Sequence, residues 1–245
     1  MGRMLYLHEV VDIVGENAVP YMEKSVLGFK TDTSADRGLD LYGTWYVMGS
    51  TGRWPQVVNV WEMPDGWDSW ERLCRSTNLK REANAELAEW WHEAYTRRSG
   101  GFDRVLGAVD GTLSLADIAA AGVTGTLFVH ELTRVRPGSA IDYLDAVAEE
   151  LAPVAAEHGH TLVGNWEVLL GDTEVCTLWA TTLEDHVAMG KAADVARGFG
   201  PIDGVEGDAR LPAWRDRARE FTTQWREELM IPCPGTPMGP AAWAG

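Results

Sequence analysis

The stretch Leu5-Tyr6-Leu7-His8-Glu9 decides the fold, because it returns in similar form as Leu127-Phe128-Val129-His130-Glu131, 122 positions further along. A second stretch, Leu41-Tyr42-Gly43-Thr44-Trp45-Tyr46-Val47, returns after 121 positions as Leu162-Val163-Gly164-Asn165-Trp166-Glu167-Val168. Three aromatic pairs keep the same order with shifts of 118 to 123: Trp61 and Trp179, Trp91 and Trp214, Phe102 and Trp225. A period this long is typical of whole repeated domains, not of a solenoid. We expect a first repeat at 1–115, a linker at 116–125 and a second repeat at 126–245.

Each repeat has the pattern strand, helix, strand, strand, helix and a terminal extended segment. The first strand is expected over Met4–Val14, and helical spacing of apolar residues follows it. Two hairpins are expected, Leu39–Met48 with Gln56–Met63 and Thr161–Leu170 with Thr173–Thr181. The later helix of the second repeat is expected to carry Trp214, Ala218, Phe221 and Trp225 on one apolar face. The fold class is therefore α+β, with two tandem ferredoxin-like repeats that form a dimeric-type α/β barrel within one chain.

Composition excludes several classes of protein. The formal net charge of −16 argues against a nucleic-acid partner, which needs clustered Lys and Arg. No apolar run approaches the roughly 20 residues that span a bilayer, so no membrane partner is expected. The first 14 residues lack the features of a signal peptide, which makes the cytoplasm the default compartment. The three cysteines, Cys74, Cys176 and Cys233, are widely spaced and support neither a disulfide framework nor a cysteine-based zinc site.

The pattern resembles the NIPSNAP family of the dimeric α/β barrel superfamily over nearly the whole chain. The resemblance is carried by the opening Met4-Leu5-Tyr6 strand, by the two Gly-x-Trp strands quoted above and by the closing segment Leu229–Pro237. Family members usually have an Arg late in the first strand, where this chain has Glu9 and Glu131. The resemblance implies the barrel fold, but it implies no single chemistry, because fold does not fix function.

Two bare sheet faces that pack together would enclose a central cavity, in which we expect small molecules to bind. Side chains alternate along a strand, so only one residue of each His-Glu pair can face that cavity. We favour Glu9 and Glu131, because a neutral His is more easily satisfied beneath helices than an ionised Glu. The two carboxylates would be general acid and base, with His8 and His130 as alternates. The carboxylates could equally form salt bridges at a sheet rim, and the histidines could be core residues or metal ligands.

The 12 tryptophans exceed expectation, and several fall on the predicted strands. They could form an aromatic wall for a flat hydrophobic ligand, or they could simply be core. Thr44 against Asn165 and Asn59 against Thr177 differ between the repeats, which predicts an asymmetric cavity with one productive site. The predicted substrate-binding residues are Trp45, Trp166, Trp61, Trp179, Thr44, Asn165 and Asn59.

No phosphate loop, dinucleotide fingerprint, nucleophile elbow or metal-ligand spacing is present in the sequence. We therefore expect a cofactor-independent enzyme, of lyase, isomerase or cyclase type, acting on a hydrophobic or aromatic metabolite. The first alternative is a non-catalytic small-molecule binding protein. The second is a haem-binding barrel with His8, His130 or His186 as the axial ligand. No metal is expected, and pairing of whole chains into a homodimer is left open.

Overall fold

The computed structural model describes residues 2–29, 37–79 and 85–243. In the first half of the chain, strands β1 and β4 flank a hairpin and several short helical segments. These elements are β1 (Leu5–Ile13), α1 (Ala18–Pro20), η1 (Tyr21–Val26), η2 (Leu27–Phe29), β2 (Asp40–Val47), β3 (Gln56–Met63), α3 (Trp67–Leu73), η3 (Cys74–Asn78), α4 (Ala85–Ala94) and β4 (Arg98–Ala108). The expected strand, first helix and hairpin are all confirmed here.

Helix α5 (Leu115–Ala121) occupies most of the expected linker and has a Ser114 capping box at its start. The second half then repeats the alternation of strands and helices. Its elements are β5 (Leu127–Val135), α6 (Ala140–Ala146), η5 (Val147–Leu151), α7 (Ala152–Glu157), β6 (Thr161–Val168), β7 (Glu174–Thr181), α8 (Leu183–Ala196), α9 (Arg210–Ala218) and β8 (Thr222–Pro232). The expected helix through Trp225 is wrong, because α9 ends at Ala218 and Trp225 lies on β8.

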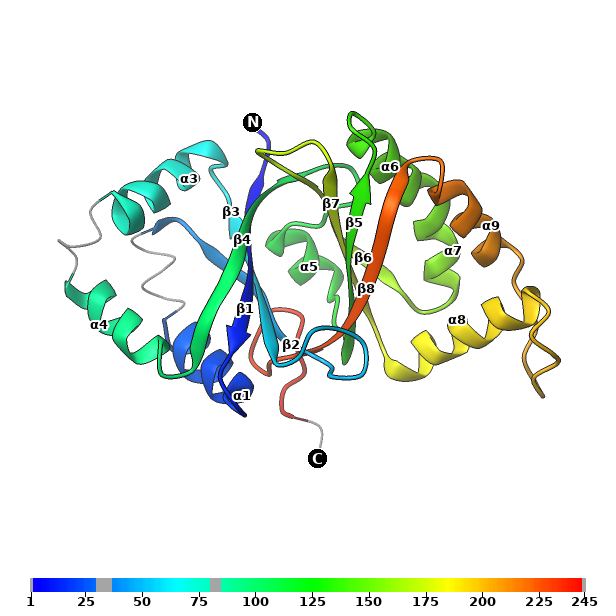
Figure 1. Cartoon of the computed structure of the whole chain (residues 1–245), viewed down its shortest axis with the longest axis horizontal. Coiled ribbons are helices and arrows are strands. Elements are labelled where there is room, and N and C mark those ends of the chain that lie inside the picture. The colour runs from blue at the N-terminus through cyan, green and yellow to red at the C-terminus, as the bar shows by residue number, and fades with distance from the viewer. Residues whose placement is uncertain (1, 30–36, 80–84, 244–245) are drawn as a thin grey trace.

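The eight strands form one closed barrel in the order β1-β3-β2-β8-β5-β7-β6-β4, with every neighbouring pair antiparallel. Each half contributes four consecutive strands with the ferredoxin-like order, β4-β1-β3-β2 and β8-β5-β7-β6. The halves meet where β2 pairs with β8 and β4 pairs with β6. Figure 1 shows the helices of the two halves on opposite outer sides of the strands. The prediction of a barrel closed within one chain is therefore confirmed.

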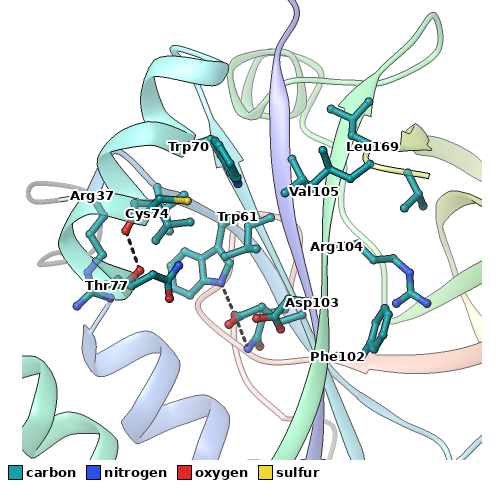
Figure 2. Close-up of a pocket in the computed structure, with 18 of the residues that line it drawn as sticks. Arg37, Trp61, Trp70, Cys74, Thr77, Phe102, Asp103, Arg104, Val105 and Leu169 are labelled. Carbon is teal, nitrogen blue, oxygen red and sulfur yellow. Dashed lines mark hydrogen bonds between the residues drawn. The ribbon is translucent and has the colours of Figure 1, made fainter. Parts of the chain in front are cut away.

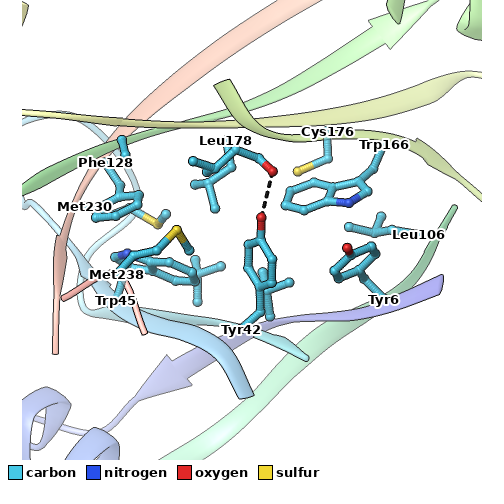
Figure 3. Packing of buried hydrophobic residues seen from close by; sticks show 14 of the residues in the cluster. Tyr6, Tyr42, Trp45, Leu106, Phe128, Trp166, Cys176, Leu178, Met230 and Met238 are labelled. Carbon is cyan, nitrogen blue, oxygen red and sulfur yellow. Dashed lines mark hydrogen bonds between the residues drawn. The ribbon is translucent and has the colours of Figure 1, made fainter. Parts of the chain in front are cut away.

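Side chains from all eight strands fill the inside of the barrel (Figure 3). Tyr6, Tyr42 and Trp166 pack edge to face or tilted, with ring centroids 5.3 to 5.9 Å apart. Trp45 packs on Phe128 at 5.3 Å. An eight-stranded barrel is just wide enough for its own side chains. The expectation of a ligand cavity inside the barrel is therefore wrong, because large aromatic residues occupy that space.

The Gly-x-Trp strands owe their glycines to this packing. Each strand has a β-bulge just before the glycine, at Leu41/Gly43 and at Leu162/Gly164. The bulge turns the following tryptophan inward, where its ring lies back across the glycine. A Cβ atom at Gly43 or Gly164 would collide with the ring of Trp45 or Trp166. Glycine is thus required by close approach of a side chain.

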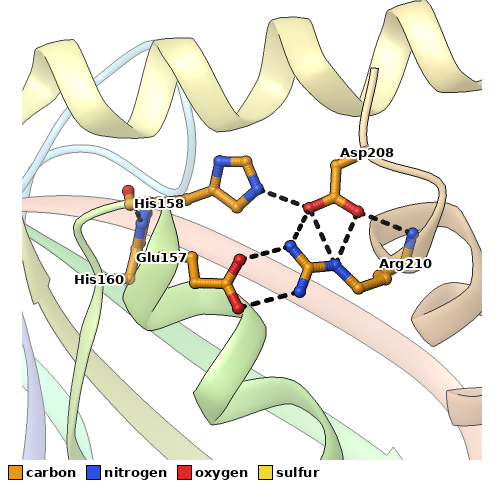
Figure 4. A network of polar contacts seen from close by, with 5 residues as sticks. All are labelled: Glu157, His158, His160, Asp208 and Arg210. Carbon is orange, nitrogen blue, oxygen red and sulfur yellow. Dashed lines mark hydrogen bonds and ion pairs between the residues drawn. The ribbon is translucent and has the colours of Figure 1, made fainter. Parts of the chain in front are cut away.

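Polar contacts fasten the helices of the second half to one another (Figure 4). Arg210 at the start of α9 binds both carboxylate oxygens of Glu157 on α7, at 2.9 and 2.7 Å. It also binds Asp208, which pairs with His158 Nε2 at 3.0 Å. These contacts hold the pKa of the Asp208 carboxyl far below its ordinary value, mainly through Arg210 and then His158. No helix in the described part of the chain has the length and apolarity to cross a membrane.

Candidate functional site

The two residues of each His-Glu pair point to opposite faces of their strands, as expected, but in the reverse sense. His8 lies on the barrel side with Tyr6, and His130 lies on that side with Phe128. Glu9 and Glu131 lie on the outer side, beneath the helices. The prediction that the two glutamates line the inside of the barrel is therefore wrong.

Hydrogen bonding explains the reversal. His8 and His130 satisfy each other across the barrel, with Nε2 atoms 3.0 Å apart. Burial and the neighbouring His130 ring hold the pKa of His8 well below its ordinary value, which keeps that imidazole neutral. Each glutamate receives indole and other side-chain donors on the helical side, so its charge is compensated there.

A ligand-sized cavity of about 560 Å³ lies between the sheet and the helices of the first half (Figure 2). Its floor comes from β1, β3 and β4, and its walls come from η1, α3, η3 and α4. The loop between β6 and β7 closes one side with Leu169 and Leu170. Aromatic and aliphatic side chains dominate the lining, among them Trp61, Trp70 and Trp91. A cavity of this size and character suits a flat organic molecule.

Two carboxylates meet at the floor of this pocket. Glu9 on β1 lies opposite Asp103 on β4 in the antiparallel register, and both line the pocket. Asp103 is an exposed side chain that lines the pocket, and partial burial of its carboxyl raises the pKa to about 6. The neighbouring Glu9 charge adds to the rise, and Arg98 opposes it. Asp103 can therefore accept or release a proton near neutral pH.

A chain of hydrogen bonds holds Glu9 in place. Its Oε2 accepts from Trp61 Nε1 at 2.8 Å and from Asn59 Nδ2 at 3.2 Å. Thr44 donates to the Asn59 carbonyl oxygen at 2.6 Å, which turns the Asn59 amide nitrogen toward Glu9. The predicted residues Glu9, Asn59 and Trp61 thus line one pocket, and Thr44 supports them from the fully buried side.

The corresponding place in the second half is filled. Glu131 lies opposite Glu227 on β8, as Glu9 lies opposite Asp103. Trp225 lies over Glu131 and donates its Nε1–H to Oε1 at 2.8 Å, and Arg215 stacks on that indole at 3.5 Å. On β4 the position two residues before Asp103 is Gly101, whereas two residues before Glu227 it is Trp225. The asymmetry between the halves therefore comes from these neighbours as well as from the Thr and Asn exchanges.

The remaining predicted residues stand away from the pocket. Trp45 and Trp166 are 1% and 0% exposed inside the barrel, so they are core residues. Trp179 and Thr177 both donate to Glu131. Asn165 donates to the backbone oxygens of Leu144 and Asp110, and so it fastens a helix and a loop to β6.

Asp103 was missed in the sequence. The sequence does contain a signal for it, because the last strand of each half has an acidic residue opposite the repeated glutamate. These acidic residues are Asp103 and Glu227. Both carboxyls have a pKa raised mainly by burial, to about 6 and about 7 respectively. Recognising them requires the strand register, because pairing Phe102 with Trp225 in the sequence places Asp103 opposite Arg226, one residue before Glu227.

Haem binding through a histidine does not fit this pocket. None of the described residues that line it is a histidine. His8 and His130 are occupied with each other, and His186 lies in the second half, 3.3 Å from His160 and 3.4 Å from Glu227.

Comparison with solved structures places the whole chain among α+β barrels. A "putative monooxygenase" from Fusobacterium nucleatum subsp. nucleatum ATCC 25586 superposes with a TM-score of 0.59 at 7% identity, over 94% of this chain and 93% of that one. A "putative monooxygenase" from Lactobacillus acidophilus NCFM gives 0.56 at 10% identity, over 94% of each chain. An "anthrone oxidase-like protein" gives 0.59 at 11% identity, over 95% and 92%. This chain therefore shares its α+β barrel fold with these three structures.

No protein-family model matches the sequence, and no curated protein resembles it significantly in sequence. The resemblance to NIPSNAP proteins therefore rests on the quoted motifs alone. The solved α+β barrels just named carry oxidative descriptions. The expectation of lyase, isomerase or cyclase chemistry is corrected by them, because they point to oxidation instead.

Proposed function

We propose that the chain is an oxidative enzyme that converts a flat, weakly acidic aromatic compound with dioxygen in the first-half pocket. The observation that carries this proposal is the carboxylate pair Asp103 and Glu9 at the floor of an aromatic-walled cavity. The descriptions of the three α+β barrels as monooxygenases and anthrone oxidase-like support it.

The pocket suits such a substrate for two reasons. Tryptophan faces offer offset stacking to fused rings, and aliphatic side chains exclude water from the rest of the ring system. Asp103 lies at the floor, where an acidic C–H or O–H of the bound molecule can reach it. Glu9 keeps its own donors from Trp61 and Asn59, so it acts as a fixed charge that raises the basicity of Asp103.

The reaction balances without an external reductant. Asp103 takes a proton from a ring methylene, and the resulting carbanion passes electrons to dioxygen. A carbon–oxygen bond forms, the oxygen–oxygen bond breaks, and the CH₂ group becomes a carbonyl. One oxygen atom enters the product, and the other leaves as water with the two hydrogens of the methylene. The chain's own part is to bind the substrate and to remove the first proton.

Anthrone provides the direct test, since its methylene is acidic and its product is a quinone with a distinct absorption. Purified protein should consume one dioxygen for each quinone formed. Asp103→Asn should lower kcat/KM by about 10²–10⁴-fold, the usual loss of a general base. Glu227→Gln is the matched control, because Glu227 holds the corresponding register position outside the pocket. If Asp103→Asn and the wild type accelerate the reaction equally over the uncatalysed rate, the role of Asp103 is refuted.

We further propose that the two halves arose by tandem duplication, with units at 1–115 and 126–245 joined by 116–125. The shared strand order and the matching positions of the two His-Glu pairs support this. Co-expression of the two fragments tests the unit boundaries: each fragment should be unstable alone and both should recover as a complex. A stable monomeric fragment would contradict them. Pairing of whole chains stays a prediction, which sedimentation would measure.

A further inference from the structure

Three ligand-type side chains meet inside the barrel, on the opposite face of β1 from the pocket. They are His8 on β1, His130 on β5 and Cys176 on β7, all buried. Their ligand atoms all lie within 4.8 Å of one another. The two imidazole rings stack with centroids 5.0 Å apart, and their Nε2 atoms are 3.0 Å apart. Figure 3 shows Cys176 pointing into this interior beside Trp166.

The distances suit a shared ion. Two nitrogens 3.0 Å apart can both lie about 2.0–2.1 Å from one metal, at an N–metal–N angle near 95°. A thiolate sulfur then completes the set at about 2.3 Å, after a shift of several tenths of an ångström. Binding through both Nε2 atoms replaces the His8–His130 hydrogen bond with two metal–nitrogen bonds. The Nδ1 atoms of both rings have no hydrogen-bond partner, so no further hydrogen bond is lost. Glu228 Oε2 lies 3.7 Å from His130 Nδ1, on the side away from the cluster, where an outer partner of a ligating histidine belongs.

The position of the cysteine distinguishes this cluster from an ordinary pair of core histidines. Cys176 pairs with Leu132, and the corresponding place on β3, opposite Val10, is Val58. The third donor is therefore present in one half only, directly where the two histidines meet. Cys233 is equally buried but belongs to the outer core of the first half.

Charge and coordination number select the ion. The charged groups close to the cluster are paired with each other, Arg104 with Glu174 at 2.7 Å and Arg226 with Glu228. A monovalent ion with one thiolate is neutral overall, which suits a dry interior. A divalent zinc ion would leave a net positive charge and would prefer a fourth ligand. Thiolate and imidazole donors together favour copper(I) among soft ions.

We propose that His8, His130 and Cys176 form a three-coordinate copper(I) site inside the barrel. Binding forms two Cu–N bonds and one Cu–S bond, and it releases one proton from the Cys176 thiol. The imidazole that had carried its proton on Nε2 changes to the Nδ1–H tautomer, so no further proton leaves. The barrel order separates β1 from β5 on both sides, so the ion would join the two halves across the interior.

The test uses the intact protein and copper(I) itself, supplied anaerobically with a reductant and a chromophoric copper(I) chelator. One equivalent should be withdrawn from the chelator, and X-ray absorption should show one sulfur and two nitrogen neighbours. At a free copper(I) concentration about 100 times Kd, Tm should rise by roughly 5–10 °C. Cys176→Ala should weaken binding by more than about 100-fold, beyond the cost of losing an outer partner. Cys233→Ala is the matched control and should bind as the wild type does.

Several results would overturn the site. Copper absorption without a sulfur neighbour, or equal weakening by Cys233→Ala, would exclude Cys176 as a ligand. Tight zinc binding with no copper(I) binding would refute the choice of ion. If Cys176→Ala fails to fold, the absorption spectrum of the loaded wild type still decides. Anthrone oxidation is measured separately, so failure of the copper site and failure of the proposed function are distinguishable.

Discussion

Glu9→Gln should lower the pH at which the enzyme gains its activity. The basic form of Asp103 is the active one, so kcat/KM should rise with pH through a midpoint near 6. Between pH 5 and pH 7 the ionised fraction grows from about one-eleventh to about ten-elevenths, roughly a tenfold gain. The charged groups that act on Asp103 are Glu9 on β1 and Arg98 on its own strand. Arg98 in turn lies 3.4 Å from the hydroxyl of Tyr21 on η1.

The magnitude follows from Coulomb's law. Two unit charges about 6 Å apart interact by about 0.7–2.8 kcal/mol for an effective dielectric constant between about 80 and 20. This corresponds to about 0.5–2 pH units, and the lower half of that range applies because burial is the larger cause at Asp103. The midpoint should fall by about 0.5–1 pH unit in Glu9→Gln while staying above 3.8, the ordinary Asp value.

Initial rates of quinone formation from pH 4.5 to 8 give the midpoint for each variant. Glu131→Gln is the control, since Glu131 has the same strand position in the second half, where Trp225 donates a hydrogen bond to it. A thermal melt at each pH excludes unfolding as the cause of a change. An unchanged or higher midpoint in Glu9→Gln, or an equal fall in Glu131→Gln, would refute the coupling between Glu9 and Asp103.

Three further outcomes test the fold. Trp166→Ala should lower the free energy of unfolding by about 3–5 kcal/mol in urea titrations, because it empties the middle of the barrel; a loss under 1 kcal/mol would contradict tight packing. Gly43→Ala should cost about 1–3 kcal/mol in the same titrations through its collision with Trp45, whereas Gly171→Ala, with open space around it, should be nearly neutral. The pKa of Asp208 is lower in the folded protein than in the unfolded chain, so Asp208 stabilises the fold above its unfolded pKa and this stabilisation is lost as the pH falls. Asp208→Asn should therefore weaken the pH dependence of the free energy of unfolding between about pH 5 and pH 2. An unchanged slope of that free energy against pH would disprove this.

Local patterns in the sequence predict much of this fold. The repeated Leu-Tyr-Leu-His-Glu stretch identifies both central strands, and the Gly-x-Trp stretches identify both hairpins. These patterns depend on neighbours along the chain, so they remain visible without the structure. The helix expected through Trp225 failed because apolar spacing in a short segment fits a strand as well as a helix, and the pairing of β8 with β5 decides it.

The pocket could be predicted only in part. Glu9, Asn59 and Trp61 stand on recognisable strands, but the sequence placed them in a cavity inside the barrel, whereas in the structure they line the outer pocket. Asp103 depends on the register between β1 and β4, 94 residues apart in sequence, and a shift of one residue places a different side chain opposite Glu9. The helical wall from η1, η3 and α4 has no motif of its own, so its aromatic residues could not be assigned to a pocket.

The alternation of side chains on β1 connects the two proposals made for this protein. His8 and Glu9 are adjacent, yet one faces a dry interior with His130 and Cys176, and the other faces the pocket with Asp103. On the pocket face, Trp61 and Asn59 donate hydrogen bonds to Glu9 and hold its carboxylate beside Asp103. On the enclosed face the His8 imidazole is neutral, and the charged Arg104 and Glu228 are each paired with a group of opposite charge. Strand β1 therefore separates the proposed oxidative site from the proposed metal site, because the pleat directs alternate side chains to opposite faces.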